Sequence, residues 1–155
     1  MEKYNLVIVD MQPEFEAVNE DWLIEAVCEE IALAKRRNLA IIVLEYDGFG
    51  ETHQDIMDTI GDYPKCFVET KFDDDGSEEV ANICTQHDLP EKFVVCGVNY
   101  SACVQRTITG MVYEQHYYAG DIAVLYHACN DPENWDYSHR TDQHLTSIGV
   151  DIVMK

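Results

Sequence analysis

Short runs rich in apolar residues alternate with amphipathic stretches along the whole chain. The runs are typical of strands buried on both faces. Between them, apolar residues recur at helical spacing. Predicted strands cover 4–10, 39–46, 65–70, 92–97, 121–127 and 149–155, and predicted helices cover 18–34, 76–88 and the region of 104–112.

Two further stretches have weaker patterns. The segment 47–64, with three glycines and scattered acids, is predicted to be mostly loop, with a short helix around 53–60. Asp131 has the character of a helix N-cap and Pro132 that of a first helical residue, so the last helix is expected to begin there.

The alternation of strands and helices predicts an α/β fold. We expect a Rossmann-like three-layer sandwich, a mostly parallel sheet of about six strands with helices on both faces. At 155 residues the chain is expected to form one domain, 1–155. Trp22 lies on the apolar stripe of the first helix and is predicted to be a core residue. Ligands of such sheets bind beyond the carboxyl ends of the strands, at the point where the strand order reverses.

Charge and cysteine usage narrow the classes of partner. The chain has 30 acidic and 10 basic residues, a formal net charge of -20, which disfavours nucleic acid and anionic membranes as partners. No apolar run is long enough for a signal peptide or a membrane span. The six cysteines are scattered and form no C-x-x-C pair, as in proteins of a reducing compartment. We therefore expect a cytoplasmic protein that binds a small-molecule substrate.

Three reactive side chains follow or end predicted strands: Asp10, Lys71 and Cys103. A helix start and a nearby lysine would stabilise a Cys103 thiolate. Asp10 could accept the thiol proton and return it to a leaving amine, while free backbone N–H groups hold an oxyanion. Taken singly, each residue also has an ordinary structural role, as a buried thiol, a turn acid or a solvated lysine.

Four segments resemble the isochorismatase-like cysteine hydrolases. They are "LVIVDMQPEF" at 6–15, "FVETKF" at 67–72, "VVCGVNYSACVQRT" at 94–107 and "YYAGDIAVLYHACND" at 117–131. The resemblance implies that Asp10, Lys71 and Cys103 are the catalytic triad. It also implies a cis peptide between Val98 and Asn99, an oxyanion site made by the N–H groups of Asn99 and Cys103, and a homo-oligomer.

The surroundings of this triad depart from the family pattern. Gln12, Phe15 and Tyr100 are expected to line a substrate pocket, although loop packing is the alternative for the first two. The run of acids at 73–75 is expected to be a solvated loop. If it faces the pocket instead, it would disfavour anionic substrates.

Metal binding is not expected. Nicotinamidases, one branch of the family, hold a metal with an Asp-x-His pair, whereas Asp47 and His53 lack that spacing here and a zinc site needs three converging ligands. We predict neither a metal nor a cofactor. His127 replaces an acid of the family pattern, and it is expected, like the other histidines, to be a surface or packing residue.

The sequence favours a cysteine hydrolase that cleaves a small amide-type substrate. A catalytically weak or inactive small-molecule-binding protein on the same scaffold remains the alternative. A redox role for Cys103 is a third reading, disfavoured because Cys96 on the preceding strand is expected to point inward and no resolving cysteine is near in sequence.

Overall fold

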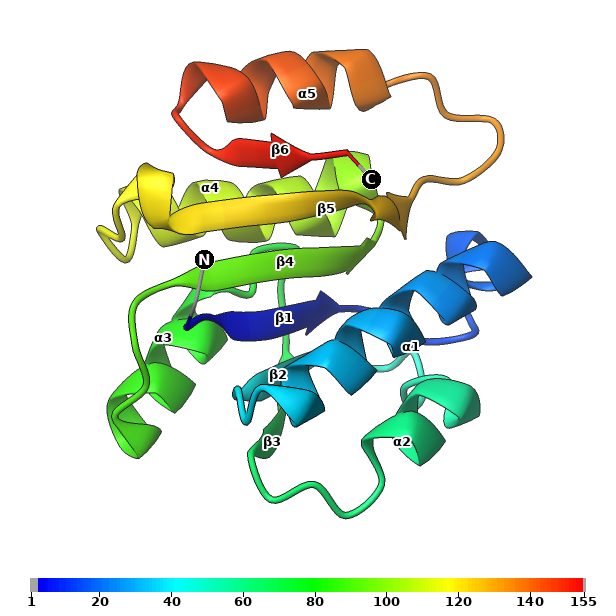
Figure 1. The fold of residues 1–155 in the computed structure, drawn as a ribbon. Helices are drawn as coiled ribbons and strands as arrows, with labels where there is room; N and C mark the ends of the chain where they lie inside the picture. The colour runs from blue at the N-terminus through cyan, green and yellow to red at the C-terminus, as the bar shows by residue number, and fades with distance from the viewer. Residues whose placement is uncertain (1–2, 155) are drawn as a thin grey trace.

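A six-stranded sheet forms the centre of the computed structural model, which describes residues 3–154 (Figure 1). All neighbouring strands are parallel, in the order β3-β2-β1-β4-β5-β6. The predicted α/β architecture is confirmed, with a sheet that is wholly parallel. The strands are β1 Asn5–Val9, β2 Ile41–Tyr46, β3 Cys66–Lys71, β4 Phe93–Val98, β5 Ile122–Asn130 and β6 Asp151–Val153.

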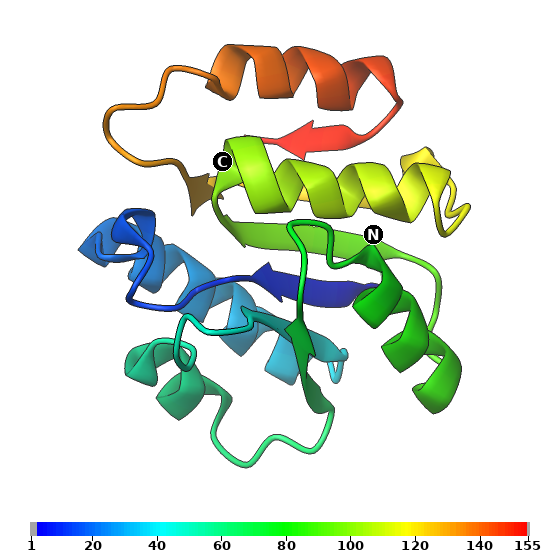
Figure 2. The same cartoon turned by 180° about the vertical axis from the view of Figure 1, so that it is seen from behind.

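Helices cover both faces of the sheet (Figures 1 and 2). Helices α1 and α2 lie on one face and α3 and α4 on the other, while α5 packs beside α4 and β6 at the far edge. Among residues 3–154, no helix is both long enough and apolar enough to cross a bilayer. The helices are α1 Asp21–Arg36, α2 Gln54–Ile60, α3 Ser77–His87, α4 Gln105–Tyr113 and α5 Ser138–Ser147.

The start of the last helix differs from the prediction. Strand β5 continues to Asn130, and α5 begins only at Ser138. Asp131 does not cap a helix, because its two carboxylate oxygens accept hydrogen bonds from the backbone N–H and the hydroxyl of Ser101, at 2.8 and 2.7 Å. A long-range partner thus replaces the local capping role that the sequence suggested.

Trp22 is not a core residue. Its side chain is 47% exposed, whereas Leu23, Val27 and Ile31 on the same helix are fully buried. The stripe of α1 that faces the sheet therefore runs through Leu23, and Trp22 lies beside that stripe in the first turn of the helix.

The strand order reverses between β1 and β4, the central pair. Close approach of these strands requires glycine at position 97. Gly97 has a φ of 123°, and a Cβ atom there would lie 2.1 Å from the carbonyl oxygen of Val9. This contact brings the ends of β1 and β4 together at the place where α/β proteins bind their ligands.

Candidate active site

Asp10 follows β1 directly and is almost completely buried. Its φ of 53° is left-handed, a conformation that aspartate adopts more readily than most residues. Its Oδ2 atom lies 3.0 Å from Nζ of Lys71, the last residue of β3. Because β2 separates these two strands, the Lys71 side chain reaches across the end of β2.

The ammonium group of Lys71 is fully buried and has several partners. Besides Asp10, it donates to the carbonyl oxygen of Asp73 at 2.9 Å and lies 3.8 Å from the ring centroid of Tyr46, the last residue of β2. A buried cation is tolerated only when it is paired in this way. The lysine therefore holds the ends of three strands together around one carboxylate.

Cys103 lies in a single π-helical turn, Tyr100–Val104, between β4 and α4. The carbonyl oxygen of Asn99 accepts hydrogen bonds from the N–H groups of Ala102 and Val104, at 3.0 and 3.1 Å. It does not accept one from the N–H of Cys103, which lies between them in the sequence. A cis peptide joins Val98 to Asn99 immediately before this turn, at the place that the resemblance implies. The turn has the feature that an oxyanion site needs, since the backbone donor of Cys103 is not taken up by the usual helical acceptor.

The Cys103 thiol contacts two carboxylates. Its Sγ lies 3.8 Å from Oδ1 of Asp74, and the charge of the neighbouring Asp10 raises the pKa of the thiol. Only 7% of Cys103 is exposed. Asp10, Lys71 and Cys103, which lie far apart in the sequence, thus form one connected cluster at the reversal of strand order.

The electrostatics favour a neutral thiol rather than the thiolate expected from the sequence. Burial and the charge of Asp10 raise the pKa of Cys103 to about 12, and the opposing effect of Lys71 is smaller. Burial also raises the pKa of Asp10 to about 6, against the lowering effect of Lys71. At neutral pH the resting site therefore holds an ionised Asp10 beside a protonated Cys103, because the carboxylate offsets the positive charge of the lysine.

The acidic run 73–75 is a loop with an exposed Asp73, as expected, but Asp74 turns inward. The Oδ1 atom of Asp74 accepts a hydrogen bond from the hydroxyl of Tyr46 at 3.1 Å and faces the Cys103 thiol. The loop is anchored on α4, where the N–H of Gly76 donates to Oγ1 of Thr107 at 3.0 Å. Sequence reasoning missed Asp74 because three adjacent acids are usually solvated, and no local pattern marks the one that turns inward.

Gln12 and Phe15 belong to the same rim of the sheet. The buried amide of Gln12 accepts from the N–H of Tyr46 at 2.8 Å and donates to the carbonyls of Tyr46 and Gly50, so it positions the loop after β2. Phe15 stacks on Phe49 with ring centroids 4.5 Å apart and lies beside Tyr46. Phe15 is thus part of an aromatic cluster next to the lysine, whereas all the hydrogen-bonding atoms of Gln12 are used within the loop.

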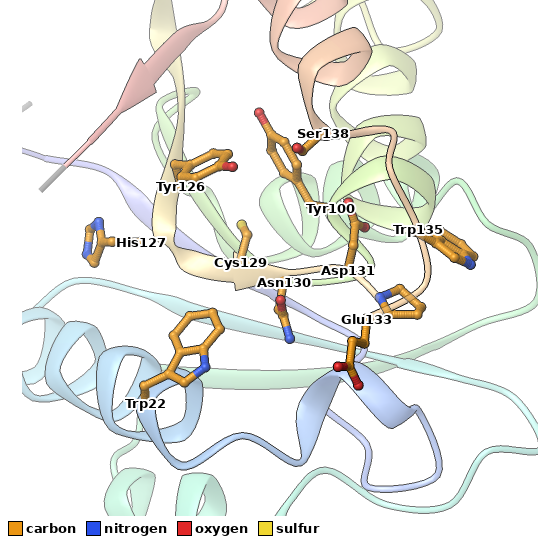
Figure 3. Close-up of a pocket in the computed structure, with 11 residues that line it drawn as sticks. Trp22, Tyr100, Tyr126, His127, Cys129, Asn130, Asp131, Glu133, Trp135 and Ser138 are labelled. Carbon is orange, nitrogen blue, oxygen red and sulfur yellow. The ribbon is translucent and has the colours of Figure 1, made fainter.

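Tyr100 lies on the other side of the nucleophile turn. It is buried, its hydroxyl donates to Asp142, and its ring meets that of Tyr126 edge-on at 5.2 Å. It lines a hollow of about 530 Å³ at the end of β5 (Figure 3). Neither Asp10 nor Cys103 lines that hollow.

The histidines have structural roles where their contacts are defined. His53 caps α2, its Nδ1 accepting the N–H of Asp55 at 3.1 Å. His127 pairs with Glu30 at 3.3 Å and so joins β5 to α1. Within the described part of the chain, no three His, Cys, Asp or Glu side chains converge as metal ligands. The six cysteines are unpaired, and Cys96 is fully buried in β4.

Fold and site define a doubly wound α/β protein with an Asp-Lys-Cys cluster where the strand order reverses. Neither protein-family models nor curated protein sequences match this chain. Several solved structures do match it. A nicotinamidase from Staphylococcus aureus is 17% identical with a TM-score of 0.81, the match covering 99% of this chain and 100% of that one.

Two further structures have the same fold. N-carbamoylsarcosine amidase from Thermoplasma acidophilum is 17% identical with a TM-score of 0.77, covering 98% of this chain and 96% of its own. An octameric hydrolase of unknown specificity from Escherichia coli is 15% identical with a TM-score of 0.78, and the match covers 99% of this chain and 76% of that one. The fold of this protein is therefore that of the nicotinamidases and related amidases.

Proposed function

We propose that the protein is an isochorismatase-like cysteine hydrolase, formed by 1–155 as one domain, that cleaves the C–N bond of a small amide-type substrate. The observation that supports the proposal is the ion pair of Asp10 with Lys71 at 3.0 Å, beside a Cys103 thiol whose pKa the charge of Asp10 raises. In the proposed reaction Asp10 is the base, Lys71 the cation that orients it and Cys103 the nucleophile. The shared fold with a nicotinamidase and an N-carbamoylsarcosine amidase supports the same reaction class.

In the first half of the reaction, Asp10 takes the thiol proton as Sγ of Cys103 attacks the substrate carbonyl carbon. The N–H groups of Asn99 and Cys103 hold the oxyanion of the tetrahedral intermediate. Asp10 then gives its proton to the leaving nitrogen, the C–N bond breaks, and a thioester remains on Cys103. Lys71 keeps Asp10 ionised and oriented between these steps.

In the second half, water attacks the thioester carbonyl and gives a proton to Asp10. Collapse of the intermediate releases the carboxylic acid, and the proton returns to the sulfur. The net reaction is amide plus water to acid plus amine, with ammonia as the amine for a primary amide.

The carboxylate of Asp74 constrains the substrate. It lies 3.8 Å from the attacking sulfur, where a negative group on the substrate would be repelled. We therefore expect neutral or positively charged amides to be preferred over substrates that carry a carboxylate next to the scissile bond.

Ammonia release from a panel of primary amides and N-carbamoyl compounds tests the proposal. Turnover should be lost in Cys103→Ala and Asp10→Asn and retained in Cys66→Ser, a half-buried cysteine of β3 outside the cluster. Intact-mass spectrometry during turnover should find the acyl group on the wild-type chain and not on Cys103→Ala. Equal turnover by wild type and Cys103→Ala would exclude the mechanism.

A small-molecule-binding protein without activity is the second candidate. Its support is the covered thiol, 7% exposed beneath Asp74. It predicts that a ligand found by thermal-shift screening binds wild type and Cys103→Ala equally well, with no turnover of any member of the panel.

The proposal also covers the oligomeric state of the protein and its location in the cell. We infer a homo-oligomer, since a structure with the same fold is an octameric hydrolase. Sedimentation of the purified chain tests this inference. A cytoplasmic location fits six unpaired cysteines, two of which, Cys96 and Cys129, have pKa values raised by complete burial.

A further inference from the structure

We propose that the hollow at the end of β5 is a binding site for a small organic cation with an alkylammonium head group. The hollow has a volume of about 530 Å³, within the range of small-molecule pockets. It opens because the chain leaves β5 at Asn130 and arches away before α5 begins at Ser138 (Figure 3). This ligand site is separate from the Asp10–Lys71–Cys103 cluster and does not depend on catalysis.

Aromatic rings line this hollow from several elements. Trp22 comes from the first turn of α1, Tyr126 from β5 and Trp135 from the loop after β5 (Figure 3). Trp22 is 47% exposed although it is a large apolar side chain in the first turn of an amphipathic helix. Indole and phenol faces attract cations that are poorly hydrated, of which alkylammonium groups are the main example.

The acids around the hollow outnumber its one basic side chain, His127, which is paired with Glu30 at 3.3 Å. Asp131 and Glu133 line it, and an adjoining hollow shares Trp22 and both acids and adds Glu16 and Glu20. No lysine or arginine is among the described residues that line either hollow. Aromatic faces together with carboxylates, and with His127 already paired to Glu30, favour a positively charged ligand over a neutral or anionic one.

The carboxylates differ in their availability. Both oxygens of Asp131 already accept hydrogen bonds from Ser101. Glu133 is exposed at the mouth of the hollow. Glu133 is therefore the acid that we assign to the ligand, with Trp22 as the principal aromatic contact.

Intrinsic fluorescence gives a direct test, because the chain has two tryptophans and both line the hollow. The wild-type protein is titrated with choline and, separately, with 3,3-dimethyl-1-butanol, which has the same shape without the charge. Sodium chloride holds the ionic strength constant. We expect choline to change the emission saturably and to bind at least about tenfold more tightly than the alcohol.

Two variants and two controls localise the effect. Trp22→Leu, followed through Trp135, should weaken choline binding about tenfold, and Glu133→Gln about threefold. Tyr118→Leu and Glu91→Gln change an exposed aromatic and an exposed acid outside the hollow and should bind as wild type.

Three results would overturn the proposal. They are equal affinity for choline and its neutral analogue, unchanged binding in both hollow variants, and loss of choline binding as the protein associates at higher concentration. The last result would place a second copy of the chain in the hollow. Because the readout needs no turnover, failure of this proposal and failure of the proposed hydrolase are distinguishable.

Discussion

The carboxylate of Asp74 lies over the sulfur of Cys103, with Oδ1 3.8 Å from Sγ. The same oxygen accepts the hydroxyl of Tyr46 at 3.1 Å, so its position is fixed from the end of β2. The contact links the acidic loop to Cys103, and the charge of Asp74 is one of the causes that raise the pKa of the thiol.

Asp74→Asn is expected to make Cys103 more reactive. The charge of Asp74 is one cause of the raised thiol pKa, so its removal lowers that pKa. Alkylation of Cys103 by iodoacetamide at pH 8 should become about three- to tenfold faster. Peptide mass spectrometry of timed samples measures the rate at this cysteine.

Asp88→Asn is the matched control, because it removes the same charge at the end of α3, outside the cluster. It should leave the alkylation rate of Cys103 unchanged. Equal acceleration by both variants would mean that net charge, rather than the contact with Asp74, sets the reactivity.

The activity should depend on the ionisation of Asp10. Burial raises its pKa to about 6, and the proposed mechanism needs the ionised form as the base. The value of kcat/KM should therefore rise with pH, reach half of its maximum near pH 6 and remain level to pH 8. A profile that is flat from pH 5 to pH 7 would show that another group accepts the proton.

Lys71→Met should destabilise the fold in a pH-dependent way. The variant leaves Asp10 buried without its cation, at a cost of about 3–5 kcal/mol at pH 8. The folded pKa of Asp10 already lies above its unfolded value of about 3.9, and losing Lys71 raises it further. The Asp10 carboxyl is then neutral in the folded state at low pH. The loss of stability caused by Lys71→Met therefore shrinks as the pH falls toward 4.

Urea unfolding at pH 5 and pH 8 measures this difference in the free energy of unfolding. The double variant Asp10→Asn, Lys71→Met removes both charges and should recover much of the stability at pH 8. A Lys71→Met loss that is equal at the two pH values would mean that packing, not charge pairing, explains it.

Gly97→Ala should be strongly destabilising. A Cβ atom would lie 2.1 Å from the carbonyl oxygen of Val9, and the φ of 123° is unfavourable for alanine. We expect a loss of about 3 kcal/mol or more in the free energy of unfolding, since both β1 and β4 must shift. Gly48→Ala, at a φ of 84° with no atom within 4 Å, isolates the backbone effect and should cost about 1 kcal/mol.

The secondary structure was predictable because it depends on local pattern. Fully buried, mostly apolar strands such as β1 and β4 are recognisable without knowledge of their neighbours. Ligands of parallel sheets bind beyond the carboxyl ends of the strands, and this tendency singled out Asp10, Lys71 and Cys103 before any contact between them was known. The short helix α2 was also predicted, within the loop that follows β2.

The errors arose where a distant partner overrides a local preference. The sequence around Asp131 is typical of a helix N-cap, but its carboxylate accepts hydrogen bonds from Ser101, thirty positions away in the chain. Trp22 follows a helical stripe but lies beside the hollow at the end of β5. Tyr100 adjoins the nucleophile in sequence, yet its ring points to the opposite side of the turn, toward Tyr126.

The sequence by itself determined the order of strands and helices, the parallel sheet and the position of Asp10, Lys71 and Cys103 at or shortly after strand ends, because periodicity and strand-end position are properties of short segments. Only the tertiary structure decided the protonation state of Cys103, the inward turn of Asp74 and the hollow beside Trp22. Each of these depends on burial and on charges brought together from separate elements, and the energy of such contacts depends on distances that exist only after the chain has folded.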